Sequence, residues 1–140
     1  MDLFAGSGSV GLEALSRSAK NVTFVEKSKV LIGVIHENVS LCGYAEKSAI
    51  IHADVKSALS DLSRKACKFN VIFADPPYNQ GLIGKTLNVL KDYPVLQKGG
   101  ILVLQHSIRE PLTPLADGWF VADQRKYGDN LLTFIRMDRA

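Results

Sequence analysis

The sequence predicts an α/β fold: a Rossmann-like, mostly parallel sheet with helices on both faces and an antiparallel hairpin at its C-terminal end. Three observations predict it. Short apolar runs alternate with helical patterns from the N-terminus to Leu104. A glycine-rich turn follows the first apolar run. Two strand-like runs near the C-terminus lie too close together for a helix to separate them.

The first half of the pattern predicts three strands and three helices. The expected elements are a strand ending at Leu3-Phe4, a helix over 11–18, a strand over 22–25 ending at Glu26, a helix over 29–41 capped by Gly43, a strand over 49–52, and a helix with apolar residues at Val55, Leu59, Leu62 and Ala66. Only four residues precede the glycine loop, fewer than a buried strand normally needs, so either residues upstream are missing or the first strand is a stump. Of the two, we expect a chain truncated before its first strand.

The second half predicts the rest of the sheet. The expected elements are a strand over 69–74, a helix over 82–93 closed by Pro94, and a strand over 101–104 after a turn at Gly99-Gly100. Residues 109–118 contain two prolines and are expected to form a loop, with or without a short helix. Strands over 119–126 and 131–136 should form the closing hairpin through residues 127–130.

Composition places the chain among ordinary globular proteins. Its 140 residues favour a single domain, and 46% hydrophobic with 22% charged residues is a typical balance. A net charge of +3 permits a nucleic-acid partner without establishing one. No apolar run has the length of a membrane span, and the histidines show no metal-ligand spacing. Cys42 and Cys67 form no Cys-x-x-Cys pair, so we expect two small buried thiols in a reduced cytosolic protein.

Gly6, Gly8 and Gly11 have the Gly-x-Gly-x-x-Gly spacing at a predicted strand-to-helix turn. Glycines there let the backbone approach a ligand closely and let the helix pack against the strand. Glu26 follows about 20 residues after Gly6, where a carboxylate can accept hydrogen bonds from both hydroxyls of a ribose. The alternative is a tight turn beside a solvated glutamate.

The acidic residues near the loop favour S-adenosylmethionine over a dinucleotide. Asp2 would repel a pyrophosphate, whereas it could accept from the cationic amino-acid end of S-adenosylmethionine. Asp54 follows the third strand, where it could accept from an adenine amino group. The alternative for Asp54 is a helix N-cap, and both roles are compatible.

The tetrapeptide Asp75-Pro76-Pro77-Tyr78 ends the fourth predicted strand. Acceptors from the Asp75 carboxylate and the Pro76 carbonyl would draw the two hydrogens of an exocyclic amine and free its lone pair. The prolines would hold these oxygens in place, and Tyr78 would stack on the base. The first and fourth strands should be neighbours, so the tetrapeptide and the glycine loop should converge. The alternative is an Asp-Pro turn followed by an exposed tyrosine.

These residues resemble the bacterial RsmD family of 16S ribosomal RNA guanine-N2 methyltransferases. The resemblance spans nearly the whole chain, and the matching stretches are residues 2–8, 11–17, 24–26, 75–78 and the Tyr127-Gly128 hairpin. It implies a seven-stranded sheet in which Glu26 holds the ribose, Asp54 the adenine and residues 75–78 the target base. Family members also carry an N-terminal extension of several dozen residues, which is absent here. The candidate catalytic residues are Asp75, Pro76, Pro77 and Tyr78, and the candidate cofactor-binding residues are Asp2, Phe4, Gly6, Gly8, Glu26, Lys27, Asp54, Val55 and Asp75.

The expected function is therefore methyl transfer from S-adenosylmethionine to guanine N2 in 16S ribosomal RNA or the assembling small subunit, by a cytoplasmic monomer. An adenine-N6 DNA methyltransferase shares the tetrapeptide, but nothing in the chain is large enough to be a DNA recognition domain. A non-catalytic, truncated RNA-binding remnant is the other alternative. Phosphate contacts are weaker expectations for the basic residues Arg17, Lys20, Lys27, Lys29, Arg125, Lys126 and Arg136. For His106 we expect a satisfied strand-end histidine rather than a contact to the base.

Overall fold

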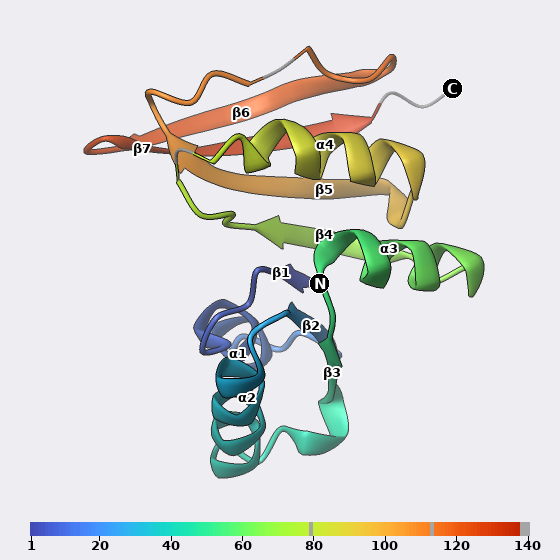
Figure 1. Cartoon of the computed structure of the whole chain (residues 1–140), viewed down its shortest axis with the longest axis vertical. Coiled ribbons are helices and arrows are strands. Elements are labelled where there is room, and N and C mark those ends of the chain that lie inside the picture. The colour runs from blue at the N-terminus through green and yellow to red at the C-terminus, as the bar shows by residue number, and fades with distance from the viewer. Residues whose placement is uncertain (79, 113, 138–140) are drawn as a thin grey trace. The chain divides into compact units, whose positions relative to one another are not determined.

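The computed structural model describes residues 1–78, 80–112 and 114–137. The chain divides into two compact units, Met1–Ala58 and Leu59–Ala140 (Figure 1). Helix α3 (Val55–Arg64) begins at the end of the first unit and continues into the second.

Three parallel strands and two α-helices form the first unit. The elements are β1 (Asp2–Leu3), α1 (Ser9–Ser16), β2 (Val22–Glu26), α2 (Lys29–Leu41), a short 3₁₀ helix η1 (Ala45–Lys47) and β3 (Ser48–His52). Strand β2 is central and pairs with β1 and β3, so that Phe24 lies opposite both Asp2 and Ile50. Helices α1 and α2 both contact β2, which makes β2 the centre of the unit.

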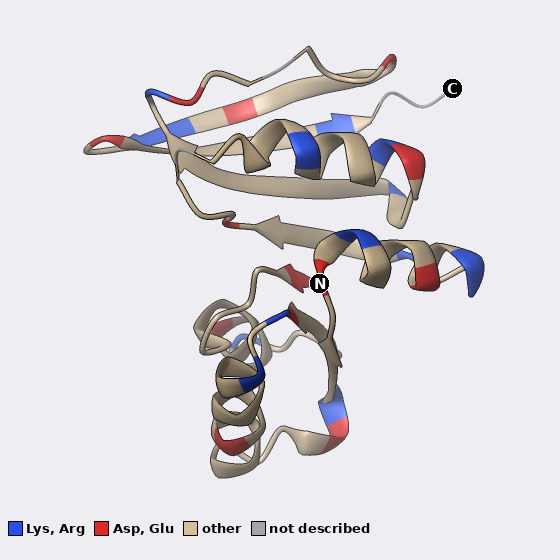
Figure 2. Cartoon of the chain, in the orientation of Figure 1, with Lys and Arg blue, Asp and Glu red and all other residues tan. Residues whose placement is uncertain are grey.

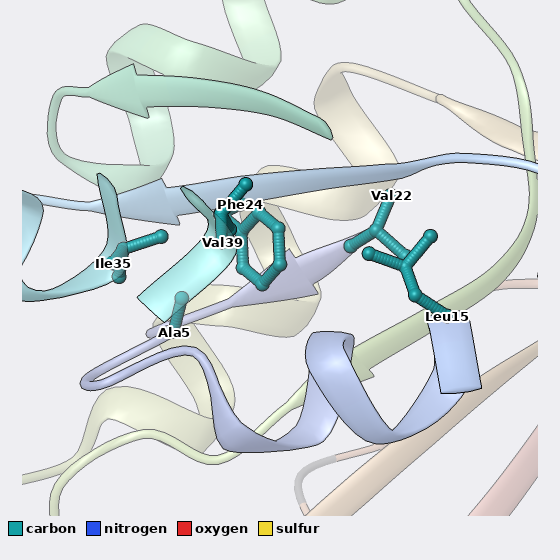
Figure 3. Close-up of a cluster of buried hydrophobic side chains, with 6 residues drawn as sticks. All are labelled: Ala5, Leu15, Val22, Phe24, Ile35 and Val39. Atoms are coloured by element: carbon teal, nitrogen blue, oxygen red, sulfur yellow. The ribbon is translucent and has the colours of Figure 1, made fainter. Parts of the chain in front are cut away.

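Apolar side chains from both helices and from β2 form the core of this unit (Figure 3). Phe24 and Ile35 are fully buried, and the buried cluster also contains Ala5, Leu15, Val22 and Val39. Gly11 sets the closeness of α1 to β2, because a Cβ atom there would lie 2.3 Å from Cε1 of Phe24. The structure thus supports the expected packing role of the third glycine.

Four strands form the sheet of the second unit. The elements after α3 are β4 (Phe69–Ala74), α4 (Leu82–Asp92), β5 (Leu96–Ser107), β6 (Trp119–Tyr127) and β7 (Asn130–Met137). Their order is β4-β5-β7-β6: β4 and β5 are parallel, and β7 is antiparallel to both β5 and β6 (Figure 1). The predicted C-terminal hairpin is therefore confirmed, with Tyr127 opposite Asn130.

Two expectations about local structure were wrong. The fifth strand begins at Leu96 rather than residue 101, because Gly99, at φ +79°, lets the chain shift register without leaving the sheet. The predicted turn is thus an irregularity inside β5. The thiols are not both buried: Cys42 is exposed, since it caps α2 beyond the last buried position Val39, and Cys67 is only partly covered. Neither cysteine forms a disulfide.

Within the described residues, no helix combines the length and the apolar character that crossing a membrane requires.

Candidate functional site

The glycine loop between β1 and α1 is tightly curled. Phe4, Gly6 and Gly8 have φ angles of 58°, 58° and 85°, in the left-handed region that favours glycine. The amide of Gly8 donates to the carbonyl of Ala5 at 2.8 Å and closes the turn. A Cβ atom at Gly6 would meet nothing within 4 Å, so the backbone of Gly6 faces open space. A ligand can approach the main chain at this point.

Glu26, at the end of β2, holds the loop in place. Its Oε1 accepts from the amide of Gly6 at 2.9 Å, and its Oε2 accepts from the amide of Ser28 at 2.8 Å. Glu26 is half-buried, so it is not the solvated glutamate of the alternative interpretation. An ionised carboxylate has about four acceptor positions. These two amides occupy two of them, and the contact of Glu26 to a ribose stays a prediction.

Ser28 is a residue that the sequence reasoning missed. It is the N-cap of α2, and its Oγ accepts from the amide of Leu31 at 3.3 Å. Glu26 binds the amide of the same residue, so it links the glycine loop to the start of α2. The signal in the sequence was the serine directly before the helical pattern.

Asp2 is buried, with 3% of its surface exposed. Its Oδ2 accepts from the amide of Gly11 at 3.2 Å, in the first turn of α1. The N-cap residue Gly8 offers no side chain to this helix, so Asp2 serves its N-terminus instead, where a negative charge is also favoured by the helix dipole. The role of Asp2 that the structure shows is thus to stabilise the N-terminus of α1.

Asp54 has the N-cap geometry that was one of its two interpretations. Its Oδ1 accepts from the amide of Ser57 at 2.8 Å, and this hydrogen bond is the main cause that lowers the pKa of the Asp54 carboxyl. Val55 begins α3 directly after it. The N-cap interpretation is confirmed, and the contact to adenine stays a prediction.

Lys27 is exposed, but its backbone is fixed. The Nε2 of His52, at the end of β3, lies 3.0 Å from the Lys27 carbonyl and must donate to it, because a carbonyl oxygen only accepts. His52 thereby ties the end of β3 to the residue that follows β2. Nothing in the sequence pattern singled this histidine out.

The tetrapeptide follows β4 directly in the second unit. Asp75 is half-buried, Pro76 is buried, and Pro77 and Tyr78 are exposed, with Tyr78 at 42%. Burial raises the pKa of the Asp75 carboxyl above its ordinary value. A carboxylate with a raised pKa is a more basic acceptor, since less water competes for it. The exposed ring of Tyr78 is available for stacking.

His106 is a satisfied strand-end histidine, as expected. It is 2% exposed at the end of β5, and its ring nitrogens lie within hydrogen-bond distance of the carbonyls of Ser107 and Glu110 and of the hydroxyl of Thr133. The interpretation as a contact to the base therefore loses its support.

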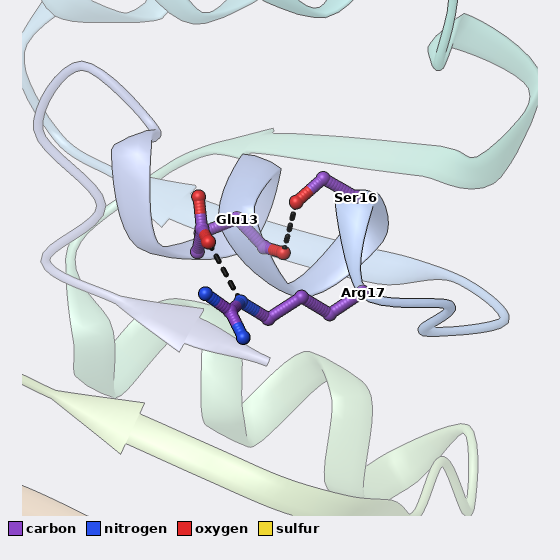
Figure 4. A network of polar contacts seen from close by, with 3 residues as sticks. All are labelled: Glu13, Ser16 and Arg17. Carbon is purple, nitrogen blue, oxygen red and sulfur yellow. Dashed lines mark hydrogen bonds and ion pairs between the residues drawn. The ribbon is translucent and has the colours of Figure 1, made fainter.

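Three of the candidate phosphate-binding residues already have partners. Arg17 pairs with Glu13 at 2.7 Å on the exposed face of α1, where Glu13 also accepts, through its carbonyl, from the hydroxyl of Ser16 (Figure 4). Arg125 pairs with Asp123 at 3.4 Å, and Arg136 donates to the carbonyl of Gly99. Such exposed pairs contribute little to stability. Figure 2 shows acidic residues interspersed with basic ones in each unit, rather than a basic stripe.

The predicted site residues thus fall into two sets. In the first unit, the structure joins Gly6 to Glu26 and Asp2 to Gly11. In the second unit, residues 75–78 stand at the carboxyl end of β4. The convergence of these two sets on one methyl-transfer site stays a prediction.

Comparisons with known proteins show the family of the chain. A family model described as "Conserved hypothetical protein 95" matches residues 1–136. Ribosomal RNA small subunit methyltransferase D of Haemophilus influenzae is 32% identical over 132 residues, covering 91% of this chain and 66% of that protein. The protein of the same name from Escherichia coli K12 is 29% identical over 128 residues, covering 91% and 63%. The chain therefore spans about two thirds of the length of these relatives.

A solved structure shows the same fold. The hypothetical protein TTHA0928 of Thermus thermophilus aligns with a TM-score of 0.83 at 30% identity, covering 97% of this chain and 73% of that one. The expectation of a Rossmann-like, mostly parallel fold is confirmed.

Proposed function

The chain belongs to the family described as Conserved hypothetical protein 95, and from this premise we propose that it is an S-adenosylmethionine-dependent ribosomal RNA methyltransferase. Residues 1–140 would act as one methyltransferase domain. Its target is the exocyclic N2 amine of a guanine in 16S ribosomal RNA, either free or in the assembling small subunit. We place this activity in the cytoplasm and assign it to a monomer.

The first unit suits the cofactor. The open space above Gly6 accepts a ligand against the main chain, and Glu26 keeps acceptor positions for ribose hydroxyls. The second oxygen of Asp54 is not used in its N-cap bond to Ser57 and can accept from an amino group. None of these groups is a phosphate-binding cation, which fits a cofactor without phosphate. When bound, S-adenosylmethionine supplies an electrophilic methyl group on a sulfonium.

The second unit suits the amine. The Asp75 carboxylate and the Pro76 carbonyl accept from the two N–H groups of the guanine amine, which draws the nitrogen toward tetrahedral geometry and frees its lone pair. Two consecutive prolines restrict the backbone, so these acceptors are in place before the substrate arrives. Tyr78 stacks on the base through its exposed ring. Alignment of the guanine nitrogen, the methyl carbon and the sulfur then contributes most of the rate enhancement over the uncatalysed reaction.

The observation that carries the proposal is the partial burial of the Asp75 carboxylate and the rise in pKa that burial causes. A half-buried carboxylate with a raised pKa, directly before two prolines, is costly for a simple turn but useful for an acceptor. This is the reason to favour an amine clamp over an Asp-Pro turn.

The test measures transfer of a labelled methyl group from S-adenosylmethionine to 16S ribosomal RNA and to isolated small subunits. Nucleoside analysis by mass spectrometry should find N2-methylguanosine; N6-methyladenosine would support the DNA-methylase chemistry instead. Asp75→Ala should abolish transfer. Asp92→Ala, at the exposed end of α4, is the matched control and should leave the rate unchanged. Full activity in Asp75→Ala would contradict the clamp.

A further inference from the structure

The carboxyl end of β5 holds a buried polar side chain that the proposed reaction does not use. His106 is 2% exposed and follows two buried apolar side chains on the same face of the strand, Leu102 and Leu104. A buried imidazole is costly unless both ring nitrogens have partners. The structure provides a partner for each nitrogen.

A chain of hydrogen bonds runs from the last hairpin to this ring. Nδ1 of His106 lies 3.1 Å from the Glu110 carbonyl and 3.2 Å from the Ser107 carbonyl, so Nδ1 carries the proton. Nε2 lies 2.7 Å from Oγ1 of Thr133, a residue with no exposed surface. The side-chain amide of Gln124 donates to the same Oγ1 at 2.9 Å. The Thr133 hydroxyl accepts from Gln124 and donates its own proton to Nε2.

The tetrapeptide and His106 both follow the carboxyl-terminal end of the β4–β5 pairing. In the parallel pair, Ala74 lies opposite Leu104. The pairing ends there, and Pro76 and His106 each lie two residues beyond this last pair. Both residues are buried. If the β4–β5 register continued for two residues, the His106 ring would lie opposite Pro76 on the same face.

We propose that His106 is a positioning residue for the Asp75–Tyr78 clamp, held in one orientation by Thr133 and, through it, by Gln124 of the last hairpin. This inference rests on the proposed function of the clamp. The carbonyl of Pro76 is one of the two acceptors, and its direction depends on what supports the proline ring. A tilt of His106 would shift that oxygen, and displacements of about 1 Å can cost about 100-fold in rate. The hairpin thereby sets the geometry of a loop three strands away in the sheet.

Thr133→Val and Thr133→Ser form a matched pair that tests this. Valine has nearly the shape of threonine but no hydroxyl, so it leaves Nε2 without its partner; serine keeps the hydroxyl. In the full chain, Thr133→Val should lower kcat for methyl transfer to 16S ribosomal RNA about tenfold or more. The Kd for S-adenosylmethionine should change less than about twofold, because all of its proposed ligands except Asp75 lie in the first unit. Thr133→Ser should recover most of kcat.

Two outcomes of this pair overturn the proposal. One is a folded Thr133→Val variant with wild-type kcat. The other is a parallel fall of kcat and cofactor affinity in both variants, in proportion to their loss of Tm, which would mark Thr133 as a general packing residue.

A readout without catalysis separates this proposal from the function it rests on. Amide hydrogen exchange at Tyr78 should be faster in Thr133→Val than in wild type and Thr133→Ser, and ¹⁵N NMR should show His106 protonated at Nδ1 in wild type. If wild type transfers no methyl group, the proposed function fails while this comparison still tests the positioning. Unchanged exchange at Tyr78 overturns the positioning role whatever the activity.

Discussion

A methyl group added at Gly11 should destabilise the protein, whereas the same group added at Gly33 should stabilise it. Both glycines lie inside α-helices, Gly11 in α1 and Gly33 in α2. Neither needs a left-handed backbone, so alanine can adopt both conformations. The two substitutions differ in what the new Cβ atom meets, which makes them a matched pair.

The structure gives the magnitude at Gly11. The added Cβ would lie 2.3 Å and 2.7 Å from Cε1 and Cζ of Phe24, and 2.9 Å from Cγ1 of Val22. Carbon contacts normally lie at about 3.5–4.0 Å, so helix and strand must separate by roughly 1 Å. Phe24 is fully buried and Val22 nearly so, hence neither can move aside freely. Overpacking costs about 1–3 kcal/mol, and the better helix propensity of alanine returns up to about 1 kcal/mol. We expect a net loss of about 1–2 kcal/mol.

At Gly33 the added Cβ meets nothing within 4 Å, so the only effect on stability is the higher helix propensity of alanine. Gly33→Ala should stabilise by about 0.5–1 kcal/mol. Thermal unfolding followed by circular dichroism measures both: Tm should fall by about 3–8 °C in Gly11→Ala and rise by about 2–4 °C in Gly33→Ala. If Gly11→Ala is as stable as Gly33→Ala, the close approach of α1 to β2 is wrong.

Three further predictions concern the acidic residues. Glu26→Gln replaces one carboxylate oxygen by an NH₂ group, which cannot accept from a backbone N–H. The affinity for S-adenosylmethionine, measured by calorimetry, should fall about tenfold, and the free energy of unfolding should fall by about 1 kcal/mol. The exposed control Glu37→Gln should change neither. Asp54→Ala should cost about 1 kcal/mol near neutral pH through the lost N-cap. Because folding lowers the pKa of Asp54, this wild-type advantage should fade as pH falls through the lowered pKa, and a difference that persists in acid would contradict the cap. Asp75→Asn should raise Tm at neutral pH, where wild type carries a half-buried charge, and lower methyl transfer about 10²–10³-fold. Since burial raises the pKa of Asp75, the gain in Tm should vanish below the ordinary Asp pKa of about 4, and a gain that is independent of pH would refute the desolvation argument.

Local rules were enough for most of the elements. The helix over 29–41 and the strand over 69–74 have the predicted bounds, because apolar residues at helical spacing mark the one and a mostly apolar run marks the other. The start of β5 was predicted wrongly because two adjacent glycines, Gly99 and Gly100, are typical of a turn. Only pairing with β4 shows that the strand continues through them.

The sequence predicted which residues belong to the candidate site better than it predicted which atoms they contact. The glycine spacing and the acid after β2 identified Gly6 and Glu26, and the structure joins them directly. The spacing could not show that Glu26 braces the backbone as well as offering acceptors. Nor could it find His52 or Thr133, because each acts through a partner at least 25 residues away along the chain.

By itself, the order of residues determined the kinds of element, the curled glycine loop and the chemistry of the Asp-Pro-Pro-Tyr segment, because these depend on backbone freedom and functional groups that neighbours along the chain define. Tertiary structure alone decided which polar groups are buried and what they bind. Burial of Asp75 sets the basicity of its carboxylate, and strand pairing brings Thr133 to His106 across 27 positions. Desolvation and hydrogen bonding act over a few ångströms in space, so no pattern of spacing along the chain encodes them locally.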